Sequence, residues 1–233
     1  MSTRPVSPDP WQSLRHLLTT KSAFGQMTIF HFESARSSEL GRSVEEAPLV
    51  EAACRLSNHT FVPFRPTNIA GFAEHLRYVF ATWKSPAEST AKPQFVLHLS
   101  CHGNDSGISI GGNKLGWAAL GDLISTAAGQ RNIPFVLMVS ACGGPTPSNL
   151  TTAFGGSVHP VYIFSFAGKV DWTDAALTWA ILYHKISAMT VGDVDAVQAL
   201  VTAIHSLALG NLRYHRWTGN KYLHFNPATQ KST

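Results

Sequence analysis

The chain alternates between short apolar runs and longer segments in which apolar residues recur every three or four positions. Two of the runs, residues 95–100 and 135–140, are apolar on both faces, and the third residue after each is a glycine. Such runs predict strands buried on both faces within a parallel sheet. Residues 27–32 and 161–166 are read as further strands. Residues 60–64 are read as an edge strand because they contain a proline.

The segments between these runs have helical periodicity. Residues 69–83 carry the clearest amphipathic stripe. Helices are also expected over residues 37–56 (interrupted by Pro48), 117–128, 174–188 and 193–209, and hairpins over 107–113 and 212–225. This alternation predicts an α/β fold, a three-layer α/β/α sandwich with a mostly parallel central sheet.

The length and composition favour one globular domain. With 233 residues, 44% of them hydrophobic and 14% charged, the chain can bury one large core. We place this domain at residues 21–227, after an arm with a short helix (1–20) and before a tail (228–233). Residues 143–160 form a long connection without a charged side chain, and their Gly, Pro, Ser and Thr content is typical of a mobile loop rather than a packed element.

The net charge and the number of cysteines limit which binding partners and which cellular compartment are expected. The net charge is only +4 and the basic residues form no run, so we expect no nucleic-acid partner. No segment reaches the length of a membrane span, and residues 1–10 lack the apolar stretch of a secretory signal. Three cysteines suggest no disulfide framework. We therefore expect a cytoplasmic protein that does not bind membranes.

Two of the predicted strands end on reactive residues. His102 follows the first strand and Cys142 follows the second. Because the carboxyl ends of parallel strands meet at one edge of a sheet, the two side chains could be neighbours in space. A thiol beside an imidazole is the minimum equipment for nucleophilic catalysis by cysteine. Gly103 allows a substrate carbonyl to approach the backbone, and Gly143 allows a sharp turn after the thiol.

The remaining histidines and cysteines are interpreted as structural. Cys101 precedes the histidine by one residue, so its side chain should point into the sheet–helix layer, and Cys54 lies on a helical stripe. The later histidines show no metal-ligand spacing with cysteine or carboxylate partners: His184, His205, His215 and His224. The sequence therefore predicts no metal and no cofactor.

The two strand ends, His-Gly and later Ser-Ala-Cys-Gly, resemble in order and spacing those of the caspase-like cysteine peptidases of clan CD. The similarity covers about residues 27–189 and is closest to the bacterial CHAT-type domains. The resemblance implies that Cys142 is the nucleophile and His102 the general base and acid. It also implies an oxyanion hole formed by the backbone N–H groups of Gly103 and Cys142.

The sequence departs from these families at the residue two before the nucleophile. Ser140 stands where metacaspases have an acidic residue and caspases a glutamine. The residues with which these two families recognise their substrates are therefore not recognisable here. In related peptidases the segment after the next strand forms a wall of the S1 pocket. Asp171 and Trp172 are therefore candidates for binding a basic P1 side chain, with an exposed surface position as the alternative for Asp171. Asp174 is expected to cap the following helix.

The resemblance suggests an endopeptidase that acts on a protein substrate as an effector in bacterial antiviral defence or cell death. A gasdermin-like pore former or another partner would be the substrate, and a separate sensor or activator protein a further partner. The alternative is a catalytically silent interaction module with the same fold. A small-ligand receiver domain is disfavoured because its strands would end in acidic residues. Residues 143–160 offer no charged residue for self-cleavage, so we expect an enzyme that works as one intact chain.

Overall fold

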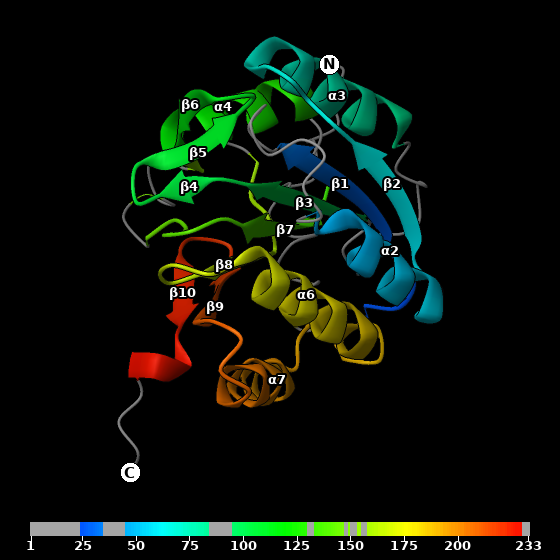
Figure 1. Ribbon diagram of the computed structural model, residues 1–233, viewed down its shortest axis with the longest axis vertical. Helices are drawn as coiled ribbons and strands as arrows, with labels where there is room; N and C mark the ends of the chain where they lie inside the picture. The colour runs from blue at the N-terminus through cyan, green and yellow to red at the C-terminus, as the bar shows by residue number, and fades with distance from the viewer. Residues whose placement is uncertain are drawn as a thin grey trace, which may run out of the picture.

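A computed structural model describes residues 24–34, 45–83, 95–129, 133–146, 149, 153–154 and 158–229. At its centre is a seven-stranded sheet in the order β10-β9-β8-β7-β3-β1-β2 (Figure 1). The strands are β1 (Thr28–Ser34), β2 (Thr60–Phe64), β3 (Phe95–Cys101), β7 (Phe135–Ser140), β8 (Tyr162–Phe166), β9 (Leu212–Trp217) and β10 (Tyr222–Phe225). Strands β2, β1, β3, β7 and β8 run parallel, while β9 is antiparallel to both of its neighbours.

Helices cover both faces of this sheet, as the alternating pattern predicted. One face carries α2 (Ala47–Leu56), α6 (Trp172–Ile186) and α7 (Val194–Ser206), and the other carries α3 (Ile69–Thr82) and α4 (Trp117–Ala128) (Figure 1). A small second sheet beside α4 contains β4 (Gly103–Asn104), β5 (Gly107–Ile110) and β6 (Asn113–Gly116). A short 3-10 helix, η1 (Pro227–Thr229), follows β10. The three-layer sandwich with a mostly parallel sheet is confirmed.

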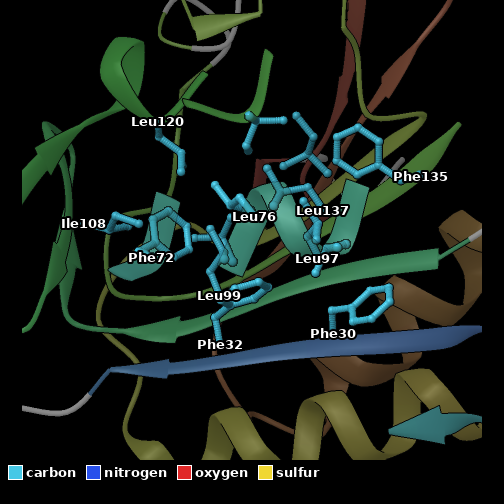
Figure 2. Close-up of a cluster of buried hydrophobic side chains, with 14 of the residues drawn as sticks. Phe30, Phe32, Phe72, Leu76, Leu97, Leu99, Ile108, Leu120, Phe135 and Leu137 are labelled. Atoms are coloured by element: carbon cyan, nitrogen blue, oxygen red, sulfur yellow. The ribbon is translucent and has the colours of Figure 1, made fainter. Parts of the chain in front are cut away.

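The two apolar runs that the sequence singled out are neighbours at the middle of the sheet. Every residue of β3 and of β7 is buried. Figure 2 shows the core on one face, where Leu97 and Leu137 from these strands belong to the same cluster as Leu76 of α3 and Leu120 of α4. Complete burial on both faces explains why these strands are apolar without alternation.

Two helices begin two or more residues away from the positions expected. The helix α2 begins at Ala47, with Pro48 in its first turn. Backbone N–H groups in the first turn have no acceptor within the helix, so a proline there removes no hydrogen bond. The helix α6 begins at Trp172 because the N–H of Ala175 donates to the carbonyl oxygen of Asp171, over 2.9 Å. Asp171 is therefore the N-cap residue, although its side chain makes no capping bond. Asp174 lies inside the first turn, so its predicted capping role is wrong.

The connection between β7 and β8 is packed in part, contrary to its loop-like composition. Ala153, Phe154 and Val158 are buried in the same core as α4. A Cβ atom on Gly121 of α4 would lie 1.7 Å from the carbonyl oxygen of Ala153, so only glycine permits this contact. A few apolar residues therefore anchor a segment whose other residues are small and polar, and its description as a mobile loop without a packed element is wrong for these residues.

Within the described ranges, none of the helices combines the length and the apolar character that crossing a bilayer requires. The predicted arm and short helix (1–20) and residues 230–233 of the predicted tail lie outside the described residues.

Candidate active site

The register between β3 and β7 brings the predicted nucleophile and base to one place. Ser100 and Ser140 are paired partners on these adjacent parallel strands. His102 follows the first by two residues, and Cys142 follows the second by two residues. Because the strands run in the same direction, both side chains leave the sheet at the same edge and at the same level.

A pocket of about 200 Å³ opens at this edge. It is lined by Cys101, His102, Ser140, Ala141, Cys142, Val170, Asp171, Trp172 and Ala175. All four residues that the sequence predicted as catalytic or substrate-binding side chains are among them. The structure brings these side chains together, and their chemical roles stay predictions.

The two central side chains are partly accessible from this pocket. Cys142 is half-buried, and its thiol donates a hydrogen bond to the carbonyl oxygen of Val170, with sulfur and oxygen 3.5 Å apart. His102 is also half-buried, and its ring meets Trp172 edge-on with 5.7 Å between ring centroids. Trp172 thus forms an apolar wall beside the imidazole, while Asp171 is exposed at the rim.

Gly103 lies against the backbone that carries Cys142. A Cβ atom on Gly103 would lie 2.8 Å from the Cβ of Ala141 and 3.2 Å from the carbonyl oxygen of Cys142. Any side chain would push these two segments apart. The absence of one therefore lets the two predicted oxyanion-hole residues, Gly103 and Cys142, approach closely.

The chain after Cys142 turns on two glycines. Gly143 has a φ of +65°, in the left-handed region, and its N–H donates to the carbonyl oxygen of Gly168 over 2.9 Å. The N–H of Gly144 donates to the carbonyl oxygen of Phe166 over 2.9 Å. A Cβ on Gly144 would lie 2.6 Å from the Cβ of Ser165. These contacts fix the direction in which the chain leaves the nucleophile.

Arg213 of β9 holds the same turn from the other side. Its guanidinium donates to the carbonyl oxygens of Gly144 and Pro145, over 2.6 and 3.1 Å. Burial lowers the pKa of this guanidinium, and the charge of Asp105 opposes that shift. Sequence reasoning missed this residue because a single arginine in a terminal hairpin carries no sign that it reaches the turn after Cys142.

The residues after His102 build a loop that is bonded to its surroundings. The Asn104 side-chain oxygen accepts from the N–H and the hydroxyl of Ser106, over 2.9 and 2.6 Å. The carbonyl oxygen of Asp105 accepts from Nε1 of Trp117 over 3.1 Å and from Nδ2 of Asn149 over 2.9 Å. The second bond ties this loop to the connection after β7.

The other two cysteines belong to the core, as predicted. Cys54 and Cys101 are buried, and burial raises the pKa of each thiol to about 12. All three cysteines are free of disulfides. Because the thiolate is the nucleophile, these two residues are poorly suited to catalysis even though Cys101 borders the pocket.

Ser140 is a pocket residue whose contact the sequence did not reveal. It lines the pocket, and its hydroxyl donates to Oε2 of Glu46, a residue that precedes α2 and is completely buried. A charged residue just before a helix usually indicates an exposed first turn, so the sequence offered no signal for this buried contact.

The mostly parallel sheet with helices on both faces is a caspase-like fold, as its likeness to solved structures shows. No family model matches the sequence, and no curated protein matches it either. Among solved structures, the chain is similar to the Drosophila initiator caspase Dronc, with 17% identity and a TM-score of 0.53 over 90% of this chain and 87% of that one.

The chain is also similar to an inactive zymogen C11 protease from Parabacteroides distasonis. The identity is 10% and the TM-score 0.53, over 84% of this chain and 63% of that one. At these identities the likeness establishes the fold, and activity must be argued from the residues of the pocket.

Proposed function

We propose that the protein is a cysteine endopeptidase in which Cys142 is the nucleophile and His102 the general base and acid. The observation that supports this most directly is the register of β3 and β7, which brings both side chains to one pocket. Cys142 is also the most accessible cysteine, whereas Cys54 and Cys101 are buried.

In this mechanism His102 takes the proton of the Cys142 thiol as the sulfur attacks the carbonyl carbon of the substrate. The N–H groups of Gly103 and Cys142 stabilise the negative oxygen of the tetrahedral intermediate. His102 then gives its proton to the leaving amine and the peptide bond breaks. A water molecule, deprotonated by His102, hydrolyses the thioester and restores the thiol.

The pocket supports a preference for a basic residue at P1. Asp171 supplies a carboxylate at the rim, Trp172 an apolar wall for the stem of a lysine or arginine, and Ser140 a neutral hydroxyl. A lysine or arginine side chain combines an apolar stem with a charged head, which suits this combination.

The biological setting follows from the resemblance to CHAT-type domains. We place the protein in the cytoplasm as an effector of antiviral defence or cell death, acting on a protein substrate such as a gasdermin-like pore former. A separate sensor or activator protein would control it. The three free cysteines support a reducing compartment.

The test is covalent labelling with an acyloxymethyl-ketone probe that carries a lysine or arginine at P1. We expect one label on Cys142, and we expect His102→Ala to abolish it. Simple alkylation would not suffice, because Cys142 is the most accessible thiol and would react first even in an inactive protein. Cys101→Ala is the control that should keep the label. A Cys142 label that does not depend on His102 would indicate a silent interaction module.

A further inference from the structure

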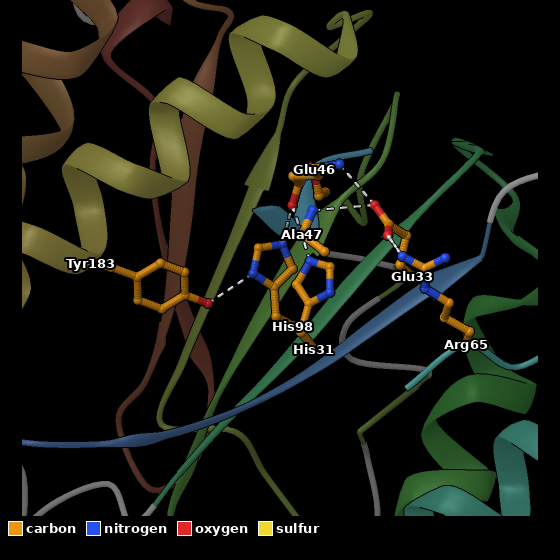
Figure 3. Close-up of polar contacts among 8 residues, drawn as sticks. His31, Glu33, Glu46, Ala47, Arg65, His98 and Tyr183 are labelled. Carbon is orange, nitrogen blue, oxygen red and sulfur yellow. Dashed lines mark hydrogen bonds and ion pairs between the residues drawn. The ribbon is translucent and has the colours of Figure 1, made fainter. Parts of the chain in front are cut away.

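Three ionisable side chains meet inside the protein, on the face of the sheet that α2 and α6 cover (Figure 3). His31 and His98 are paired partners on β1 and β3, and Glu46 immediately precedes α2. All three are completely buried. Because ionisable groups are rarely buried without a compensating partner, this cluster requires an explanation.

The potential ligand atoms of these side chains face one another. Oε1 of Glu46 lies 2.7 Å from Nε2 of His98 and 3.6 Å from Nε2 of His31. One ligand atom from each residue can be chosen so that all three lie within 4.8 Å of one another. The side chains therefore converge on one point rather than forming a chain of contacts.

The contacts between these three atoms are close but poorly aligned for hydrogen bonding. Nε2 of His31, Nε2 of His98 and Oε1 of Glu46 are buried and make no well-aligned hydrogen bond. A proton on Nε2 of each histidine could compensate the carboxylate, through the close contact of His98 and the longer contact of His31. One cation at the point of convergence would satisfy all three atoms at once.

Contacts around the cluster orient it in the manner of a metal site. The Tyr183 hydroxyl lies 2.8 Å from Nδ1 of His98, and the Ser140 hydroxyl donates to Oε2 of Glu46. These partners engage the outer atoms and leave Nε2 of His98 and Oε1 of Glu46 facing inward. Metal-binding histidines and carboxylates are usually held by such outer contacts.

We propose that His31, Glu46 and His98 bind a divalent metal ion, and that Zn²⁺ is the ion this donor set suits. Two imidazole nitrogens and one carboxylate oxygen are typical zinc ligands, at about 2.0–2.2 Å from the metal. Tetrahedral ligands at that distance lie about 3.4 Å apart. The 3.6 Å pair fits this spacing, and the 2.7 Å pair needs to open slightly. This proposal revises the expectation of no metal, which rested on the spacing of other histidines.

The ion would have a structural role. His98 precedes His102 by four residues of extended chain, about 13 Å at 3.3 Å per residue, so the ion would not reach the reacting atoms. It would instead connect β1 and β3 to the start of α2. Through Glu46 and the Ser140 hydroxyl it would also hold β7 two residues before Cys142.

The experiment uses the full chain without an affinity tag, stripped with a chelator and then titrated with Zn²⁺ alone. We expect one tightly bound equivalent by elemental analysis and a rise in Tm of several degrees. Co²⁺ in its place should give the visible absorption of a tetrahedral site. Neither readout depends on peptidase activity.

Variants locate the ion. Glu46→Gln and His31→Gln should each lose the bound equivalent, whereas His215→Gln, at a buried histidine on β9, should keep it. The proposal is overturned if the folded chain binds no stoichiometric Zn²⁺, or if the two cluster variants bind it as the unmodified chain does. If a cluster variant does not fold, the stoichiometry and Co²⁺ spectrum of the unmodified chain decide.

Discussion

The thiol of Cys142 donates a hydrogen bond to the carbonyl oxygen of Val170, across 3.5 Å. A carbonyl oxygen can accept a hydrogen bond from a thiol, but it is not a base that removes the proton. Activation must then depend on a base in the same pocket, and His102 is the imidazole that lines it. In the proposed peptidase, the nucleophile forms when the proton of Cys142 moves to His102.

Replacement of the proposed nucleophile should abolish catalysis and leave the fold intact. For Cys142→Ala we expect peptide cleavage to fall by at least about a thousandfold, with an unchanged Tm, because the half-buried thiol contributes little packing. Cys101→Ala is the matched control and should keep most of its activity, although the loss of a buried side chain will lower its Tm. Loss of turnover in the Cys101 variant alone would contradict the assignment.

The carboxylate at the pocket rim should determine the P1 preference. In a peptide library we expect lysine or arginine at P1, and Asp171→Asn should reduce kcat/KM for these peptides about tenfold or more through the lost charge pairing. Asp174→Asn, in the first turn of the same helix but outside the pocket lining, should leave the preference unchanged. An acidic or apolar P1 preference in the unmodified enzyme would refute this role.

A methyl group at Gly103 should impair catalysis through the backbone. In Gly103→Ala the new Cβ would meet Ala141 at 2.8 Å, so the strand end must move away from Cys142. Displacing one oxyanion-hole donor reduces kcat by about a hundredfold or more, and we expect a loss of that order with a small change in KM. Gly168→Ala, where a Cβ meets nothing within 4 Å, is the control that should behave as the unmodified enzyme.

A buried histidine on β9 should make the fold sensitive to acid. Burial, with the charges of His224 and Arg213, lowers the pKa of His215 to about 3. An unfolded histidine titrates near pH 6.5, so as the pH falls below about 6.5 the unfolded chain takes up a proton that the folded chain refuses. The free energy of unfolding should therefore decrease by about 1.4 kcal/mol per pH unit toward about pH 3 from this residue alone.

His215→Gln should remove that contribution. Urea unfolding at a series of pH values measures it as the difference in slope between the variant and the unmodified chain. Equal slopes for the two proteins would show that His215 does not titrate in this way.

The active enzyme should consist of one unbroken chain. Residues 143–160 contain no Asp, Glu, Lys or Arg, so neither an acidic nor a basic P1 preference provides a self-cleavage site there. Intact-mass measurement of freshly active protein should give the full-length mass. A requirement for two fragments that meet within this segment would refute the single-chain mechanism.

The layers of the fold were predictable because each rests on local periodicity. The apolar runs of β3 and β7 and the stripe of α3 needed no knowledge of distant residues. The position of the candidate site followed from them, because the carboxyl ends of parallel strands lie at the same edge of the sheet. The start of α6 was not predictable in this way, because it depends on a backbone hydrogen bond to Asp171 rather than on the capping preference of Asp174.

Contacts between distant segments were beyond the sequence. His31 and His98 are each a polar residue within an otherwise apolar strand, and this pattern could have identified them as candidates for a buried polar site. Their contact with each other, however, depends on the register of β1 against β3. Glu46 joins them only because α2 begins at that point of the sheet. Arg213 reaches the turn after Cys142 only because β9 pairs with β8.

The order of the strands has a consequence for how the molecule could be divided. The boundary between β7 and β8 divides the sheet into two halves that are each continuous in sequence. The strands that precede the β7–β8 connection lie on one side of it (β2, β1, β3 and β7), and those that follow lie on the other (β8, β9 and β10). A break in the connection would produce two pieces joined by the β7–β8 ladder, by contacts between helices and by hydrogen bonds such as that between Tyr183 and His98. The packing of α6 against α2 would hold such pieces together. The chain is therefore suited to fragment complementation, with catalytic competence as the signal that two separately made halves have met.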